Sequence, residues 1–139
     1  MITPATTEQL PRIIELLDQA DLPTDDLPAP QVDFFVELDA RGRIVGAAGL
    51  ERRGAAQLLR SVVVCPTERG RGVGATLVAA AMASVGSDPT YLLTADAERY
   101  FERLGFRAVA RDALPIDIQA HPQVTHLCPA SATAMELVR

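Results

Sequence analysis

One stretch joins an apolar strand to a glycine-rich turn and the start of a helix: Leu58-Leu59-Arg60-Ser61-Val62-Val63-Val64-Cys65-Pro66-Thr67-Glu68-Arg69-Gly70-Arg71-Gly72-Val73-Gly74-Ala75-Thr76. The three glycines at alternate positions allow the backbone to curl, so that successive N–H groups converge on one point. The N-terminus of the following helix adds partial positive charge at the same point. Arg69 and Arg71 add full charges, and Thr76 adds a hydroxyl. The stretch therefore predicts a diphosphate-binding site.

Three other interpretations of these glycines fit less well. A dinucleotide-binding fingerprint needs GxGxxG early in a βαβ unit and an acid about 20 residues further on, whereas here the order is GxGxG in mid-chain. A P-loop needs a lysine, and all 13 cationic side chains of this protein are arginine. A purely structural turn would need neither the flanking arginines nor the passage from strand to helix.

Composition bounds the class of protein. The chain has 139 residues, 48% of them hydrophobic, with a mean hydropathy of +0.13, and we expect residues 1–139 to form one domain. The absence of lysine excludes Schiff-base and pyridoxal-phosphate chemistry on a lysine side chain. A net charge of −5 and a pI near 4.9 argue against nucleic acid and anionic membranes as partners. The N-terminal residues lack the features of a signal peptide, which predicts a cytoplasmic protein.

The sequence offers little for a metal or a disulfide. Cys65 and Cys128 lie far apart and outside any CxxC motif, so we expect two reduced thiols. His121 and His126 are five residues apart, which misses the i, i+4 spacing of helical metal ligands. We therefore expect no metal cofactor.

Periodicity and turn residues predict a mixed α/β (α+β) fold with a central sheet. We expect helices over residues 6–20, 72–85 and 97–104 and a helical turn over 115–120. Strands are expected over 32–38, 44–51, 57–64, 91–94, 106–110 and 133–138, and residues 21–31 should form an extended, proline-rich loop.

Two motifs resemble the GNAT N-acetyltransferase superfamily. Arg69-x-x-Gly72-x-Gly74, after a strand and Val64-x-Pro66, is similar to that family's acetyl-CoA loop. Residues 97–106, Ala-Glu-Arg-Tyr-Phe-Glu-Arg-Leu-Gly-Phe, look like its later A-x-x-(L/F)-Y-x-x-x-G-F motif. The resemblance implies the GNAT fold, a mostly antiparallel sheet of six or seven strands that splays open at the cofactor strand, and acetyl-CoA as co-substrate.

The resemblance also implies roles for individual residues. The backbone of Val62 and Val64 would pair with the pantetheine arm, and an N–H near Val62 or Val63 would donate to the thioester carbonyl. The cofactor-binding residues would be Val62, Val63, Val64, Arg69, Gly70, Arg71, Gly72, Val73, Gly74, Ala75, Thr76, Thr94 and Phe101.

The acid and base positions depart from the family pattern. The family often has a tyrosine four residues before the Gly-Phe glycine, as general acid to the departing thiolate, and an asparagine seven residues earlier. Here these positions are Phe101 and Thr94. Tyr100 is the candidate acid, although one helical residue is a turn of about 100° and would require reorientation. Glu51 is the candidate base, with a surface carboxylate beside two arginines as the alternative.

The acceptor side suggests a small carboxylate-bearing amine. Arg60 shares a predicted strand face with Val62 and Val64, where it would clamp a substrate carboxylate or, alternatively, pair with a core acid. Cys128 and Ser131 would line the acceptor pocket, although Cys128 also suits a small buried apolar position. The C-terminal part of the chain, from Leu92 on, looks similar to the acetyltransferase domain of N-acetylglutamate synthase. The segments Leu58–Ser61 and Leu127–Ala132 look similar to small GNAT proteins associated with arsenic-resistance operons.

The sequence therefore predicts an acetyl-CoA-dependent N-acetyltransferase that acts on an amino-acid-like amine by direct transfer in a ternary complex. Cys65 has no evident base that would make it an acyl carrier. A non-catalytic acetyl-CoA sensor is the main alternative, and acetylation of protein or tRNA is a weaker one. Exposed strand edges are compatible with a homodimer.

Overall fold

A seven-stranded sheet forms the centre of the computed structural model, which describes all 139 residues. The strands are β1 (Ile2–Pro4), β2 (Val32–Leu38), β3 (Ile44–Arg53), β4 (Ala56–Val64), β5 (Thr90–Thr94), β6 (Phe106–Val109) and β7 (Thr133–Leu137). They lie in the order β1-β2-β3-β4-β5-β7-β6. Every neighbouring pair is antiparallel except β4 and β5. The predicted mixed fold with a mostly antiparallel sheet is confirmed.

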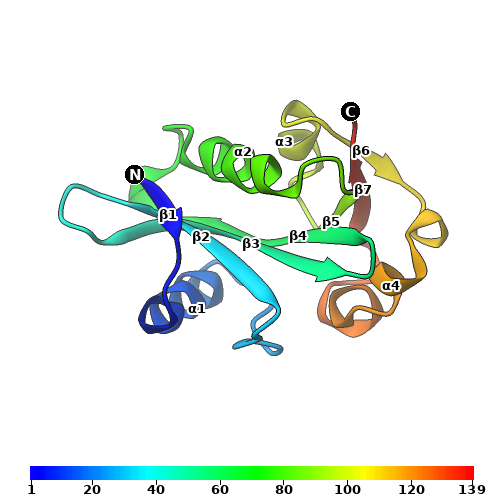
Figure 1. Cartoon of the computed structure of the whole chain (residues 1–139), viewed down its shortest axis with the longest axis horizontal. Helices are drawn as coiled ribbons and strands as arrows, with labels where there is room; N and C mark the ends of the chain where they lie inside the picture. The colour runs from blue at the N-terminus through cyan, green and yellow to red at the C-terminus, as the bar shows by residue number, and fades with distance from the viewer.

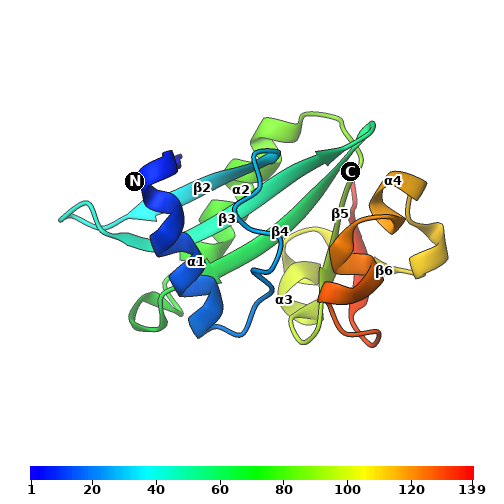
Figure 2. The ribbon, with the colours of Figure 1, turned by 90° about the horizontal axis from the view of Figure 1, so that it is seen from below.

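Helices cover both faces of this sheet (Figure 1). Helices α2 (Val73–Val85) and α3 (Glu98–Arg103) cover one face, and α1 (Leu10–Gln19) and α4 (Ile116–Gln119) the other, which Figure 2 shows from below. One apolar cluster packs α2 and α3 onto the sheet through Leu77, Phe101 and Leu59. A second cluster packs α1 through Leu17 and Val63. None of the helices has the length and apolar character needed to cross a bilayer.

Most expected elements lie within two residues of their predicted ends, and the predicted helix over residues 6–20 begins with a 3-10 turn at Thr7–Gln9. Pro11 falls in the first turn of α1, where a missing N–H costs nothing. The sequence missed β1, because three residues are too few to show a period. It also missed a short π-helix at Gln123–Leu127, in the segment that leads into β7.

The sheet opens between β4 and β5. These parallel strands pair at only two positions, Gln57 with Thr90 and Leu58 with Tyr91, and then diverge. The part of β4 beyond Leu58 therefore has a strand neighbour on its β3 side only. This is the predicted splay at the cofactor strand, and the site lies in it.

Candidate active site

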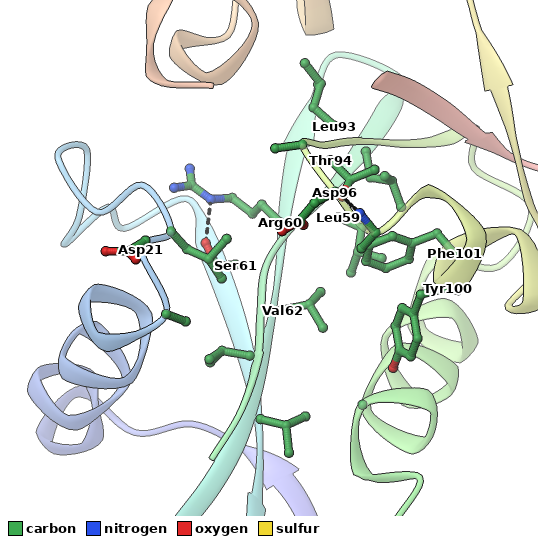
Figure 3. Close-up of a pocket in the computed structure, with 18 of the residues that line it drawn as sticks. Asp21, Leu59, Arg60, Ser61, Val62, Leu93, Thr94, Asp96, Tyr100 and Phe101 are labelled. Carbon is green, nitrogen blue, oxygen red and sulfur yellow. Dashed lines mark hydrogen bonds between the residues drawn. The ribbon is translucent and has the colours of Figure 1, made fainter. Parts of the chain in front are cut away.

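A cavity of about 810 Å³ lies at the splay and reaches both faces of the sheet. On the α2 face it is lined by Val62, Val64 and Tyr100 and by the start of α2. On the α1 face it is lined by Ala20–Pro23, Arg60, Ser61, Gln123 and Leu127–Pro129. Figure 3 shows the two groups of side chains on opposite sides of β4. The gap between β4 and β5 thus joins a glycine-rich helix start to a second compartment.

A bulge at Ser61 sets which side chains enter each compartment. The β3–β4 register shifts between Ala47 and Gly49, and Ser61 has a left-handed φ of 58°. An extra residue in one strand reverses the alternation of side chains beyond it. Arg60 consequently points toward the α1 side and Val62 toward the α2 side (Figure 3). The prediction that Arg60 shares a face with Val62 and Val64 is wrong, because strand alternation does not hold across the bulge.

The backbone of Val64 faces the splay. The Cys65 N–H donates to the Val45 carbonyl of β3 at 2.7 Å, so in an antiparallel ladder the polar groups of Val64 point the other way. By the same alternation, the backbone N–H and C=O of Val62 point toward the splay, and the Val63 N–H points toward its partner Ala47. Of the two expected donors to a thioester carbonyl, the register therefore favours Val62 over Val63.

The start of α2 presents a set of free amides. Gly72 caps the helix with a φ of 77°, a conformation that favours glycine. The first intrahelical backbone bond runs from the Thr76 N–H to the Gly72 carbonyl, which leaves the N–H groups of Val73, Gly74 and Ala75 without a helical partner. These amides and the helix dipole form a site suited to an anion.

Of the three side chains expected to add charge or a hydroxyl to this loop, only one lines the cavity. Arg69 lines the cavity, and its Nε donates to the Val64 carbonyl at 3.3 Å. Arg71 is exposed beside Glu68 and does not line the cavity. The Thr76 hydroxyl donates to the Gly72 carbonyl at 2.8 Å and is likewise outside the lining. Of the predicted loop residues, Arg71 and Thr76 would therefore need to move to reach a ligand in the cavity.

Helix α3 supplies an aromatic wall. Phe101 is buried and packs edge-on against Tyr100, with ring centroids 5.2 Å apart. A Cβ added at Gly74 would lie 2.2 Å from the Tyr100 hydroxyl, so that hydroxyl rests on the first turn of α2. Burial raises the Tyr100 pKa. Thr94 lines the cavity, but its hydroxyl accepts the Ala97 N–H and fixes the turn into α3.

Arg60 is held by two acids from separate segments. Its side chain is completely buried, and its guanidinium donates to both carboxylate oxygens of Asp26, at 2.5 and 2.7 Å. The same group donates to Glu51 Oε1 at 3.0 Å. The structure thus places Arg60 in the alternative arrangement, a pair with buried acids. A substrate carboxylate would have to displace Asp26 to be clamped by Arg60.

Glu51 is not the surface carboxylate that the alternative interpretation described, because it is only 1% exposed. Its Oε1 accepts from Arg60 and from His121 Nε2, the latter at 2.8 Å, and its Oε2 pairs with Arg53 at 3.3 Å. Glu51 does not line the cavity. Both oxygens are therefore engaged, which disfavours the expected role as a general base.

The three groups Asp26, Glu51 and His121 come close enough to suggest a cation site. Arg60 already lies between the two carboxylates and balances their charge. The His121 ring adds a donor to Glu51, because its Nδ1 accepts the Gln123 N–H at 3.0 Å and its proton is therefore on Nε2. The donor set suits an arginine counter-ion and does not point to a metal.

Glu51→Gln should destabilise the protein most near neutral pH. Burial opposes the charge of Glu51, but hydrogen bonds from His121 and Arg60 outweigh it and hold the Glu51 pKa below its ordinary value. A carboxyl group with a lower pKa in the folded state adds stability above its unfolded pKa and loses it as pH falls through the folded pKa. Urea unfolding should show a stability difference from wild type that is constant near pH 7 and shrinks below about pH 4.3. A difference that grows on acidification would contradict the network.

Of the two C-terminal residues expected to line the acceptor pocket, only Cys128 lines the cavity. Burial raises the pKa of its thiol. Ser131 is exposed and outside the lining, so the structure does not bring it to the site. Cys65 Sγ contacts the Thr67 hydroxyl at 3.5 Å and no base. Both cysteines are free.

Sequence reasoning missed Asp26, His121 and Gln123. The spacing of His121 and His126 addresses only metal binding, and His126 is exposed and takes no part in the network. A signal did exist, because an arginine within an apolar strand needs a buried acid. The sequence did not reveal which acid, since Asp26 lies 34 residues from Arg60 in an irregular loop.

Comparisons with known proteins agree with this geometry. The sequence model of the acetyltransferase (GNAT) domain matches residues 30–108. A comparison with curated protein sequences finds no match. Among solved structures, a GNAT-family acetyltransferase from Staphylococcus aureus Mu50 is similar, with 18% identity, a TM-score of 0.81, and 99% of this chain and 97% of that chain covered.

Two further structures were crystallised with ligands. Rv2747 from Mycobacterium tuberculosis, in complex with CoA, shares 20% identity with a TM-score of 0.81, over 100% of this chain and 99% of that chain. N-acetylglutamate synthase from Neisseria gonorrhoeae, complexed with coenzyme A and N-acetyl-glutamate, shares 16% identity with a TM-score of 0.74, over 100% of this chain and 36% of that chain. These likenesses show the fold. The domain match spans more than half of the sequence, and this chain therefore belongs to the GNAT family of acetyltransferases.

Proposed function

We propose that this protein transfers the acetyl group of acetyl-CoA to the amino group of a small amino-acid-like molecule, directly and in one ternary complex. The observation that carries this proposal is the cavity at the splay, which joins the amides at the start of α2 to a separate compartment on the α1 face. Two substrates can thus approach one point from opposite faces of the sheet.

The α2 side suits acetyl-CoA. The free amides of Val73, Gly74 and Ala75, together with Arg69, would hold the diphosphate. The free backbone of Val64 offers a strand-like partner to the amides of the pantetheine arm. The CoA complexes of Rv2747 and of N-acetylglutamate synthase support this assignment.

The transfer step needs little from acidic or basic side chains. The amine nitrogen attacks the thioester carbon, a C–N bond forms, and the C–S bond breaks as the thiolate leaves. The amine attacks in its neutral form, and a thiolate whose thiol has a pKa of about 8.5 leaves without a strong donor. Water would take the proton that the amine loses. The Val62 N–H would donate to the carbonyl oxygen as negative charge develops.

Tyr100 as the proton donor to the thiolate remains a prediction. Its hydroxyl rests on Gly74 at the start of α2 rather than at the splay. We therefore propose that Tyr100 mainly contacts the bound cofactor at the start of α2. Phe101 occupies the family's tyrosine position and contributes only apolar packing.

The acceptor class rests on similarity to other acetyltransferases. The likeness to N-acetylglutamate synthase supports an amino acid as acceptor. The resemblance to acetyltransferases of arsenic-resistance operons adds amino-acid-like arsenical and phosphinic compounds to the candidates. We also propose that residues 1–139 act as one domain in the cytoplasm, and that a homodimer can form through exposed strand edges.

A thiol reagent that detects released CoA tests the proposal. The purified protein is incubated with acetyl-CoA and each of a panel of amino acids, simple amines and amino-acid analogues. We expect CoA release with at least one amino-acid-like amine, at a rate that saturates with both substrates. Binding of acetyl-CoA without release on any amine would instead favour a sensor.

Arg103 should contribute to cofactor binding through the 3′-phosphate of CoA. Of the 13 arginines, only Arg41, Arg99 and Arg103 have neither an ion pair nor a side-chain hydrogen bond in the structure. Arg103 follows Tyr100 by three residues on α3, so the two side chains occupy neighbouring positions on that helix, and the Tyr100 hydroxyl contacts the start of α2.

Arg103→Ala should therefore weaken CoA binding by about tenfold, and leave 3′-dephospho-CoA binding unchanged. Isothermal titration with the two ligands measures this difference. Arg41→Ala, in the β2–β3 turn, is the matched control and should bind both ligands as wild type does. An equal loss for both ligands in Arg103→Ala would show that Arg103 does not recognise the 3′-phosphate.

A further inference from the structure

The α1 compartment needs a polar group that can recognise an acceptor. Arg60 is the residue expected to do so, but its N–H groups donate to Asp26, Glu51 and the Ser61 hydroxyl. Asp26 is itself held by Arg60, and Glu51 lies outside the cavity. Recognition of a polar acceptor therefore has to come from another side chain of this compartment.

Gln123 is the buried polar side chain that stands out. Seven polar or charged residues are buried: Glu51, Gln57, Arg60, Thr90, Thr94, His121 and Gln123. Six of them make side-chain hydrogen bonds within the chain. Gln123 is 4% exposed and lines the cavity, and its carboxamide makes none. The unpaired carboxamide atoms of Gln123 are not among the fully buried side-chain atoms, so they keep accessible surface and are available to a ligand in the cavity.

The backbone of Gln123 is fixed on both sides. Its N–H donates to His121 Nδ1 at 3.0 Å, and its carbonyl accepts the Cys128 N–H at 3.0 Å. His121 is in turn held by Glu51, which Arg60 and Arg53 hold in place. The buried network thus ends at the backbone of Gln123 and fixes the point from which its side chain enters the compartment.

We infer that the Gln123 carboxamide recognises the carboxylate of the amino-acid-like acceptor, and that His121 is the positioning residue that orients Gln123. The Nε2 group of Gln123 would donate to one carboxylate oxygen, a hydrogen bond strengthened by the charge of the acceptor. Arg60 would stabilise the compartment without touching the acceptor. This inference rests on the proposed function and adds the residue that selects the acceptor.

The test compares an amino acid that is acetylated with the amine that lacks its carboxylate. Gln123→Met keeps the side-chain length and removes the hydrogen bond. We expect a rise of about tenfold in KM for the amino acid, with little change for the simple amine or in the KM for acetyl-CoA. Gln123→Glu should weaken the amino acid further, because it places two carboxylates together, and should favour the simple amine.

Gln31→Met, an exposed position outside the cavity, is the control and should match wild type for both acceptors. An unchanged KM in Gln123→Met, or an equal change for both acceptors, would overturn the inference. If wild type acetylates no amine, the proposed function fails instead, so the two failures are distinguishable.

Two substitutions at His121 separate positioning from stability. His121→Asn can keep an acceptor near Nδ1 for the Gln123 N–H but cannot reach Glu51. His121→Gln can reach toward Glu51 but loses the contact with Gln123. Both should lower the unfolding midpoint, whereas only His121→Gln should raise the KM for the amino acid. Equal KM values in the two variants would show that His121 does not act through Gln123.

Discussion

Gly72→Asp should weaken acetyl-CoA binding by about a hundredfold, roughly 2.7 kcal/mol. Gly72 caps α2 beside the free amides of Val73, Gly74 and Ala75, the group to which we assign the diphosphate. An aspartate carboxylate at the cap would accept these amides itself and would repel the phosphates. Both effects act on the ligand, whereas the backbone strain of a side chain at this left-handed φ acts on the protein and needs its own control.

Gly72→Asn is the matched control for backbone strain and size. The φ of 77° at Gly72 is left-handed, and asparagine and aspartate tolerate that region better than most residues. The two variants differ mainly in charge, so isothermal titration should show a much smaller loss in Gly72→Asn. Equal affinities in the two variants would mean that the helix start does not hold the diphosphate.

Arg60→Met should lower the free energy of unfolding by about 3–5 kcal/mol, because it removes the cation that lies between the buried Glu51 carboxylate and the partly buried Asp26 carboxylate. Glu51 is 1% exposed, and Asp26 is also largely covered. Removing one partner of a buried pair costs more than the pair contributes, since the remaining charge is left uncompensated. Urea unfolding at pH 7 measures the loss, and a constant m value would confirm that the comparison is valid.

The neighbouring Arg52 supplies the control. Arg52 pairs with Asp88 at the surface, with 60% of its own side chain exposed, and Arg52→Met should cost less than about 1 kcal/mol. Adding Asp26→Asn and Glu51→Gln to Arg60→Met should recover part of the lost stability, because no buried charge then lacks a partner. A cost in Arg60→Met no greater than that in Arg52→Met would contradict the buried network.

The sequence was sufficient for the fold because its local signals agree. The predicted strand over residues 32–38 has the bounds of β2, and Gly72 and Gly86 flank α2 as expected. The glycine loop and the Ala97–Phe106 motif fall on the start of α2 and on α3, as their resemblance implied. Periodicity and caps are encoded by residues close in sequence, so they can be read without the fold.

The acceptor compartment was not predictable in the same way. One extra residue at Ser61 turns Arg60 to the opposite face, and bulges leave no clear sequence pattern. Asp26 and His121 reach Arg60 and Glu51 from loops that are distant in sequence. Gln123 lies on a short helix that periodicity did not reveal. The position of each of these side chains depends on tertiary packing.

The most direct test of the account follows both products of one reaction. Wild-type protein is mixed with acetyl-CoA and an amino acid that released CoA in the panel of amines. CoA and the N-acetylated product are then measured while the concentrations of acetyl-CoA and of the amino acid are varied independently. Direct transfer in the cavity predicts one CoA for each acetylated amine and initial-rate lines that intersect. Saturable binding of acetyl-CoA with neither product formed, on any amine of the panel, would contradict the account.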